Sequence, residues 1–143
     1  MKKKKKKLIK SKSAKVQSPN YVKGIKKEIN YLKPHVNDDL EWYNEGRELL
    51  DKNLLPEAEL KFKELVVSQP LSQDGYEGLA RVYEITGDKD KAIYFINRAI
   101  EASKKFLSDE RISEHYKDFL KRINNMQIYR KNILIVNSLF TIQ

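Results

Sequence analysis

Two arginines, Arg47 and Arg81, lie 34 residues apart, each five residues after an aromatic side chain. A guanidinium group carries a rigid fork of donors that binds a carboxylate or a phosphate at two points. This pair therefore suggests a site for an anionic group. The alternative is that both arginines form ion pairs inside the domain, with Glu48, Glu77 or Glu84.

Side chains for catalysis or metal binding are sparse. The chain has no cysteine, which excludes a disulfide, a thiolate nucleophile and a cysteine zinc site, and is compatible with a cytoplasmic location. The two histidines, His35 and His115, do not have a metal-binding spacing such as H-E-x-x-H. The five glycines do not form a phosphate-binding loop. We therefore expect a protein that is not an enzyme, that has no small-molecule substrate and that needs neither a cofactor nor a metal.

The spacing of the two arginines belongs to a longer repeat. Five further pairs keep the 34-residue spacing: Trp42 with Tyr76, Leu49 with Tyr83, Ala58 with Ala92, Phe62 with Ile96, and Leu65 with Ala99. Large, small and aromatic residues in register at a fixed period are typical of stacked supersecondary units. Such units form extended binding surfaces.

Each repeat has the pattern of two helices. Residues 40–50 carry apolar side chains on a first helix, and Pro56 lies in the first turn of a second. The second helix has apolar residues at the i, i+4, i+7, i+8 spacing: Ala58, Phe62, Leu65 and Val66. Asn53-Leu54 and Gly87-Asp88 are turn signals between the paired helices. A last amphipathic stripe predicts a capping helix over residues 109–125; its residues are Ile112, Tyr116, Phe119, Leu120 and Ile123. The whole pattern predicts an all-α fold.

These units resemble the tetratricopeptide repeat (TPR), W-x2-L-G-x2-Y…A-x3-F…P. In the first unit, residues 39–72, the matching residues are Trp42, Gly46, Leu49, Ala58, Phe62 and Pro70. In the second unit, residues 73–106, they are Tyr76, Leu79, Ala80, Tyr83, Ala92 and Ile96. Glu45 replaces the expected Leu, and Lys104 the closing Pro. The resemblance implies a short right-handed α-solenoid of antiparallel helix pairs, with a domain over residues 38–127.

The resemblance also implies a function. In this family the first helix of each unit lines a concave groove that binds a peptide or helix of a partner protein. A scaffold or adaptor module for protein–protein interaction is therefore expected. The partner-binding residues would be Tyr43, Arg47, Leu50, Glu77, Arg81 and Glu84. Some members clamp a chaperone's C-terminal carboxylate with Lys and Asn; Tyr43 and Arg47 occupy the first two of those positions here, so this partner is not expected.

Residues 1–37 have a different composition. They contain 13 lysines, including Lys2 to Lys7, and one acid, Glu28, which gives +12; because the whole chain is +9, residues 38–143 together carry −3. A block of like charge repels itself, so a disordered tail is predicted. Within it, Ile25, Ile29 and Leu32 have the i, i+4, i+7 spacing that allows a short helix over residues 24–32. One alternative to the adaptor is that Lys2–Lys15 binds nucleic acid or an anionic membrane while the repeats recruit a second partner, or directs the protein to the nucleus. The other is a solvated leader without a ligand.

Residues 128–143 are predicted to be an apolar C-terminal extension. The segment from Ile133 to Ile142 reads ILIVNSLFTI and is too short to cross a bilayer, which needs about 20 apolar residues. Two alternatives remain for it: packing against the last helix pair as part of the cap, or an aggregation-prone end.

Overall fold

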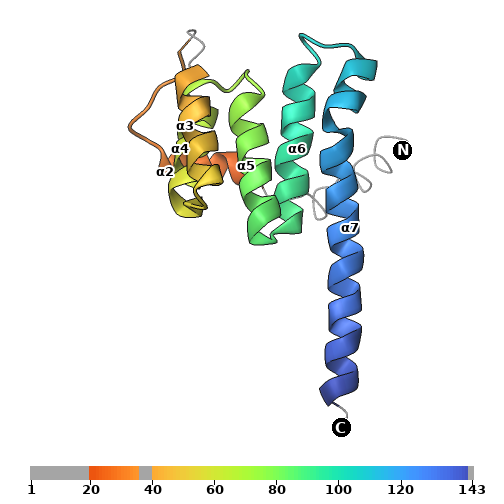
Figure 1. Ribbon diagram of the computed structural model, residues 1–143. Helices are drawn as coiled ribbons and strands as arrows, with labels where there is room; N and C mark the ends of the chain where they lie inside the picture. The colour runs from red at the N-terminus through yellow and green to blue at the C-terminus, as the bar shows by residue number, and fades with distance from the viewer. Residues whose placement is uncertain (1–19, 36–39, 142–143) are drawn as a thin grey trace, which may run out of the picture.

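The computed structural model describes residues 20–35 and 40–141, with the backbone alone for residues 126–141. This part of the chain contains six helices and no strand, which confirms the prediction of an all-α fold (Figure 1). The helices are α2 (Tyr21–Glu28), α3 (Leu40–Asp51), α4 (Leu55–Ser68), α5 (Asp74–Thr86), α6 (Lys89–Ser103) and α7 (Asp109–Thr141).

Helices α3 to α6 stand side by side and form two antiparallel pairs (Figure 1). Helix α3 packs on α4, α5 packs on α6, and α4 joins the two pairs through its contact with α5. The predicted apolar stripes meet between them: Phe62 and Leu65 of α4 are buried, as are Tyr76 of α5 and Ile96 of α6. Burial of these side chains is the main source of the domain's stability.

The ring of Phe62 fixes the close approach of α3 and α5. It lies against Gly46 of α3 and Gly78 of α5, and a Cβ atom at either glycine would overlap it. Both positions therefore require glycine, because any side chain there would collide with the Phe62 ring. Gly46 lies in the position that the sequence pattern reserves for a small residue, whereas the role of Gly78 was not predicted.

The turn inside each pair repeats in backbone geometry. Asn53 and Gly87 lie 34 residues apart and both have a positive φ, 59° and 85°. Beside them, the amide of Leu54 donates to the carbonyl of Leu49, and the amide of Asp88 donates to the carbonyl of Tyr83, both at 2.9 Å. A left-handed residue after the last helical turn is a common helix end, and Gly and Asn adopt it at least cost. The 34-residue spacing is thus found in main-chain conformation and hydrogen bonds as well as in side-chain types.

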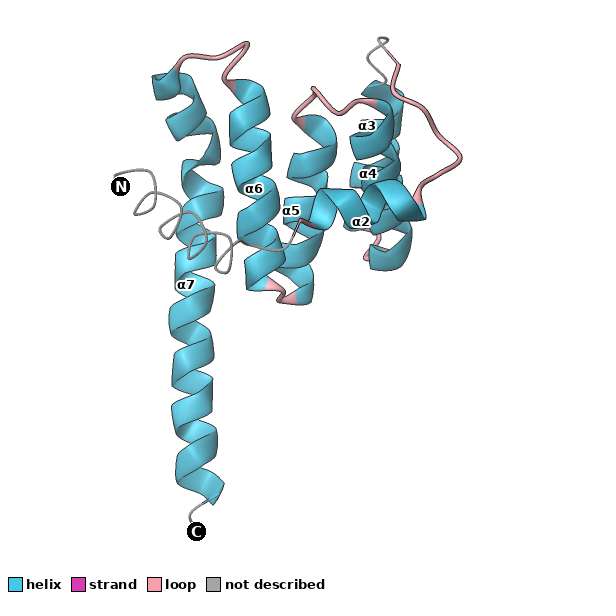
Figure 2. Cartoon of the chain, turned by 180° about the vertical axis from the view of Figure 1, so that it is seen from behind, coloured by secondary structure: helices cyan, strands magenta, loops and turns pink. Residues whose placement is uncertain are grey.

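Helix α2 corrects the predicted extent of the tail. Figure 2 shows α2 crossing the helical layer, and its side chains Val22 and Ile25, with Ile29 just beyond its end, belong to the hydrophobic core. Two polar contacts fix it to α4: Lys63 Nζ lies 2.9 Å from a Glu28 oxygen, and the Tyr31 hydroxyl donates to Glu64 at 2.8 Å. Residues 20–35 are therefore part of the folded domain. The prediction of disorder for residues 1–19 lies outside the described residues.

Helix α7 begins where the capping helix was predicted but continues without a break through Thr141. It packs on α6, and four residues of the predicted stripe are buried: Ile112, Tyr116, Phe119 and Ile123. The fifth, Leu120, is 38% exposed, so the stripe is narrower than predicted. Beyond this stripe the helix runs past the ends of the other helices (Figure 1). The backbone of residues 133–141 therefore does not fold back onto the last helix pair, which rules out the first alternative for the apolar segment.

Candidate functional site

The six residues predicted to bind a partner lie on two neighbouring helices. Tyr43, Arg47 and Leu50 of α3 have the i, i+4, i+7 spacing that places side chains on one side of a helix. Their counterparts 34 residues later on α5 are Glu77, Arg81 and Glu84, and α3 contacts α5 directly. We call these six residues the α3–α5 face. Its two arginines are exposed, and its other four residues are half-buried.

Tyr43 packs against α4 and lies among charged groups of both helices of this face. Its ring lies 6.2 Å from the ring of Phe62, and the guanidinium carbon of Arg47 lies 5.9 Å from the Tyr43 centroid, in range of a cation–π contact. Burial raises the pKa of Tyr43, and the nearby Glu77 raises it further, while Arg47 and Arg81 act in the opposite direction. Charged groups of both helices therefore act on one phenol, and the structure brings these four predicted residues together.

Glu77 is bound by α7. The Tyr116 hydroxyl donates to the Glu77 carboxylate at 3.2 Å, and His115 Nε2 lies 3.5 Å from the same oxygen. Burial raises the pKa of Tyr116; its contact with Ser103 acts in the opposite direction, and the charge of Glu77 raises the pKa further. Tyr116 therefore keeps its proton and acts as a donor to Glu77.

Glu84 is also bound by α7. Arg122 donates to its two oxygens from Nε at 2.6 Å and from Nη2 at 3.3 Å. This hydrogen bond to Glu84 raises the pKa of Arg122. Arg81 is one turn away on the same helix, but its Nε lies 3.9 Å from the nearer Glu84 oxygen. The strong partner of Glu84 is thus Arg122.

The α3–α5 face therefore has a positive exposed charge. Its two acids are engaged by α7, and a part for Glu77 and Glu84 in binding a partner stays a prediction. Within the described residues, Arg47 contacts the Tyr43 ring and Arg81 makes only the long contact to Glu84. The alternative of tight ion pairs for both arginines is not observed in this part of the chain.

Three contributors to this site were missed from the sequence: His115, Tyr116 and Arg122. They lie 38 or 39 residues after the glutamates that they contact, so no local pattern links them. The stripe that predicted α7 identified Tyr116 as a core residue only. The hydrogen bond from its hydroxyl to Glu77 could be predicted only from the way α7 docks on the domain.

Comparisons with models of known protein families, with curated proteins and with solved structures found no significant match. Among the described residues, no helix combines the length and the apolar character needed to cross a membrane.

Proposed function

We propose that this chain is a protein–protein interaction module whose α3–α5 face binds a peptide or a helix of a partner protein. The proposal treats α3 to α6 as two TPR-like units of a short right-handed solenoid, capped by α7. Two observations support this treatment: the side-chain pairs at a spacing of 34, and the two helix ends with equivalent hydrogen bonds at the same spacing.

The observation that carries the proposal is the contrast between the acids and the arginines of the α3–α5 face. Glu77 and Glu84 are engaged by α7, whereas Arg47 and Arg81 are exposed in equivalent positions on adjacent helices. A partner segment with a carboxylate side chain matches this charge. Half-buried Tyr43 and Leu50 supply apolar area beside the arginines, and a face held in place by its own packing loses little entropy on binding.

The test is selection of a displayed peptide library on the full chain and on the double variant Arg47→Ala with Arg81→Ala. We expect the wild type to enrich peptides rich in Asp or Glu, and the double variant to bind the same peptides at least tenfold more weakly, because an arginine anchor commonly contributes about 2 kcal/mol to binding. Arg111→Ala, an exposed arginine of α7, is the matched control. Equal affinity of the double variant would refute the proposed face.

A second candidate function rests on helix α2. Its inner side is apolar, whereas Lys23, Lys26 and Lys27 are exposed on a helix that is fixed to the domain. In the sequence these lysines follow the lysine-rich residues 1–19, so residues 1–27 contain 12 lysines and no acid, a charge that favours a polyanion. In this alternative the basic segment binds nucleic acid or an anionic membrane, and the repeats recruit a second partner.

Salt dependence separates the two candidates. Binding of a labelled DNA duplex by the basic segment loses affinity steeply between 50 and 200 mM salt, by about 10³-fold for six phosphate contacts. The triple variant Lys23→Gln, Lys26→Gln and Lys27→Gln should lower that slope. Co-sedimentation with anionic lipid vesicles tests the membrane. No binding to either polyanion at 50 mM salt would exclude this candidate.

A further inference from the structure

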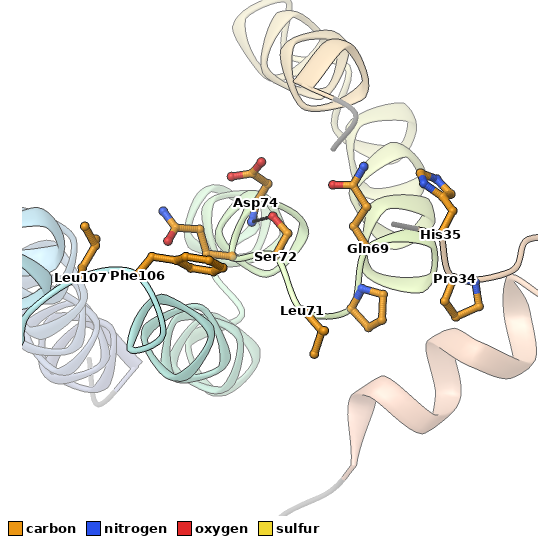
Figure 3. Close-up of a pocket in the computed structure, with 10 residues that line it drawn as sticks. Pro34, His35, Gln69, Leu71, Ser72, Asp74, Phe106 and Leu107 are labelled. Carbon is orange, nitrogen blue, oxygen red and sulfur yellow. Dashed lines mark hydrogen bonds between the residues drawn. The ribbon is translucent and has the colours of Figure 1, made fainter. Parts of the chain in front are cut away.

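A pocket of about 710 Å³ lies where three connecting segments meet (Figure 3). Its walls are Pro34 and His35 before α3, residues 69–73 between α4 and α5 with Asp74 at the start of α5, and Phe106 with Leu107 between α6 and α7. Except for its proximity to the start of α5, this pocket is separate from the α3–α5 face, and neither proposed function uses it. Its volume falls in the range of about 300–1,000 Å³ that is usual for small-molecule sites.

The rim of the pocket is unusually apolar for a protein surface. Phe106 is 75% exposed and Leu71 is 67% exposed, and these are the two most exposed large hydrophobic residues in the described part of the chain. Both line this pocket. Exposed apolar residues scattered singly are ordinary, whereas these two lie around one concavity, where a ligand could cover both.

The walls are held in place before any ligand arrives. Each is fixed by a hydrogen bond: His35 N to Ser68 O at 2.8 Å, the Tyr76 hydroxyl to Pro70 O at 2.8 Å, and Leu107 N to Ser103 O at 2.9 Å. Two of these acceptors belong to the ends of packed helices, α4 and α6. A preformed pocket binds without the entropic cost of ordering loops.

The polar groups of the pocket define the charge of its ligand. Asp74 is the acid among the ten lining residues, and none of the ten is Lys or Arg. A negatively charged ligand is therefore repelled, whereas a neutral or cationic one is not. Gln73 and Ser72 give the pocket a polar edge: Gln73 Oε1 accepts from Ser103 Oγ at 2.6 Å and Ser72 Oγ accepts from the amide of Asp74 at 3.2 Å, so the Gln73 N–H groups and the Ser72 hydroxyl hydrogen are what they offer a ligand.

We propose that this pocket binds a small molecule with an aromatic or alicyclic body and a neutral or cationic polar group. The ligand's ring contacts Leu71, Phe106 and the prolines, and its polar group meets the amide edge. This assignment does not depend on the function of the α3–α5 face.

The experiment uses three probes with the same ring: 2-naphthalenemethanol, 2-naphthylmethylammonium and 2-naphthoate. Each is titrated into the ¹⁵N-labelled full chain while amide chemical shifts are recorded. We expect the alcohol and the ammonium to shift amides in residues 69–74 and at Phe106 and Leu107, with dissociation constants on the order of 1 mM for a ligand of this size. The naphthoate should bind several-fold more weakly, and Asp74→Asn should remove that difference.

Matched variants locate the site. Leu71→Ala with Phe106→Ala should weaken the alcohol about fivefold or more, because the ring loses its apolar contacts. Both side chains are exposed, so the fold should be retained, which thermal melting checks. Ile85→Ala with Leu120→Ala changes two exposed apolar residues outside the pocket and should leave binding unchanged.

Three results would overturn the assignment. The first is the absence of shifts in these loops with all three probes at 10 mM. The second is equal binding by the Leu71→Ala, Phe106→Ala variant. The third is sedimentation equilibrium showing a dimer that this variant dissociates, since a second copy of the chain would then cover the pocket.

Discussion

Arg122 on α7 and Glu84 on α5 are joined by two hydrogen bonds, and the shorter one measures 2.6 Å. The equivalent position on α3 is Leu50, so the first unit carries an apolar side chain where the second carries an acid. The acid is one of the points at which α7 attaches to the second helix pair, together with Glu77. Two positions 34 residues apart thus differ in side chain, and only the second of them forms a hydrogen bond with α7 among the described residues.

Arg122→Ala should lower the free energy of unfolding by about 0.5–1 kcal/mol, measured by urea denaturation. The arginine side chain is 48% exposed, so water screens the ion pair and keeps its contribution small. Lys121→Ala changes the preceding exposed residue and should have no effect. An equal loss in both variants would show that the pair with Glu84 does not stabilise α7.

Gly78→Ala should destabilise the domain by about 1–3 kcal/mol, because the new methyl group overlaps the buried ring of Phe62. Gly24→Ala is the matched control. A Cβ at Gly24 meets nothing within 4 Å, and alanine is the better helix former by about 0.5–1 kcal/mol, so this variant should be slightly more stable. Thermal melting by circular dichroism distinguishes the two. The melting temperature should fall for Gly78→Ala and rise for Gly24→Ala. A Gly78→Ala variant with a raised melting temperature would contradict the packing at Phe62.

Two truncations test the corrected boundary of the tail. Removing residues 1–19 should leave the melting temperature unchanged, whereas removing residues 1–35 should lower it strongly. The second deletion takes away Val22, Ile25 and Ile29, and each buried side chain of this kind contributes about 1.5–3 kcal/mol. Identical melting of the two truncated chains would mean that α2 adds nothing to the core.

Stability should fall above about pH 10, the ordinary pKa of tyrosine in an unfolded chain. Burial raises the pKa of both Tyr83 and Tyr116, so the native state holds these protons to a higher pH than the unfolded state does. Their contribution is complete below pH 10 and is lost as the pH rises above it, because the unfolded state then binds fewer protons.

Melting temperatures between pH 8 and 11.5 measure this loss. Tyr83→Phe with Tyr116→Phe should flatten the alkaline part of the curve, although it also removes hydrogen bonds to Glu59 and Glu77 and so lowers stability at neutral pH. Absorbance at 295 nm provides a check. If all eight tyrosines ionise in one step while helicity is retained, the raised pKa values are wrong.

The all-α fold was predictable because the signals for α3 to α6 are local. Pro56 opens α4, Gly87 ends α5, and the apolar stripe of each helix lies within one stretch of sequence. Helix α2 was missed as a core element since three apolar residues among many lysines do not outweigh the composition. Its burial depends on α4, which lies about 35 residues away.

The candidate site was predictable only in part. Equivalent positions in the two units gave the six residues of the α3–α5 face, because a repeat reproduces the side of a helix as well as its length. The sequence did not reveal that Glu77 and Glu84 are already engaged. Both acids are engaged because α7 docks with Tyr116 beside Glu77 and Arg122 beside Glu84. The sequence does not show how α7 docks.

The uninterrupted helix α7 also determines how the molecule moves through a solvent. Its 33 residues make a rod about 50 Å long, against roughly 20 Å for each of α3 to α6. A protein with such a projection has more friction than a sphere of the same mass. Removal of residues 126–143 should therefore reduce the hydrodynamic radius by more than the loss of mass alone accounts for.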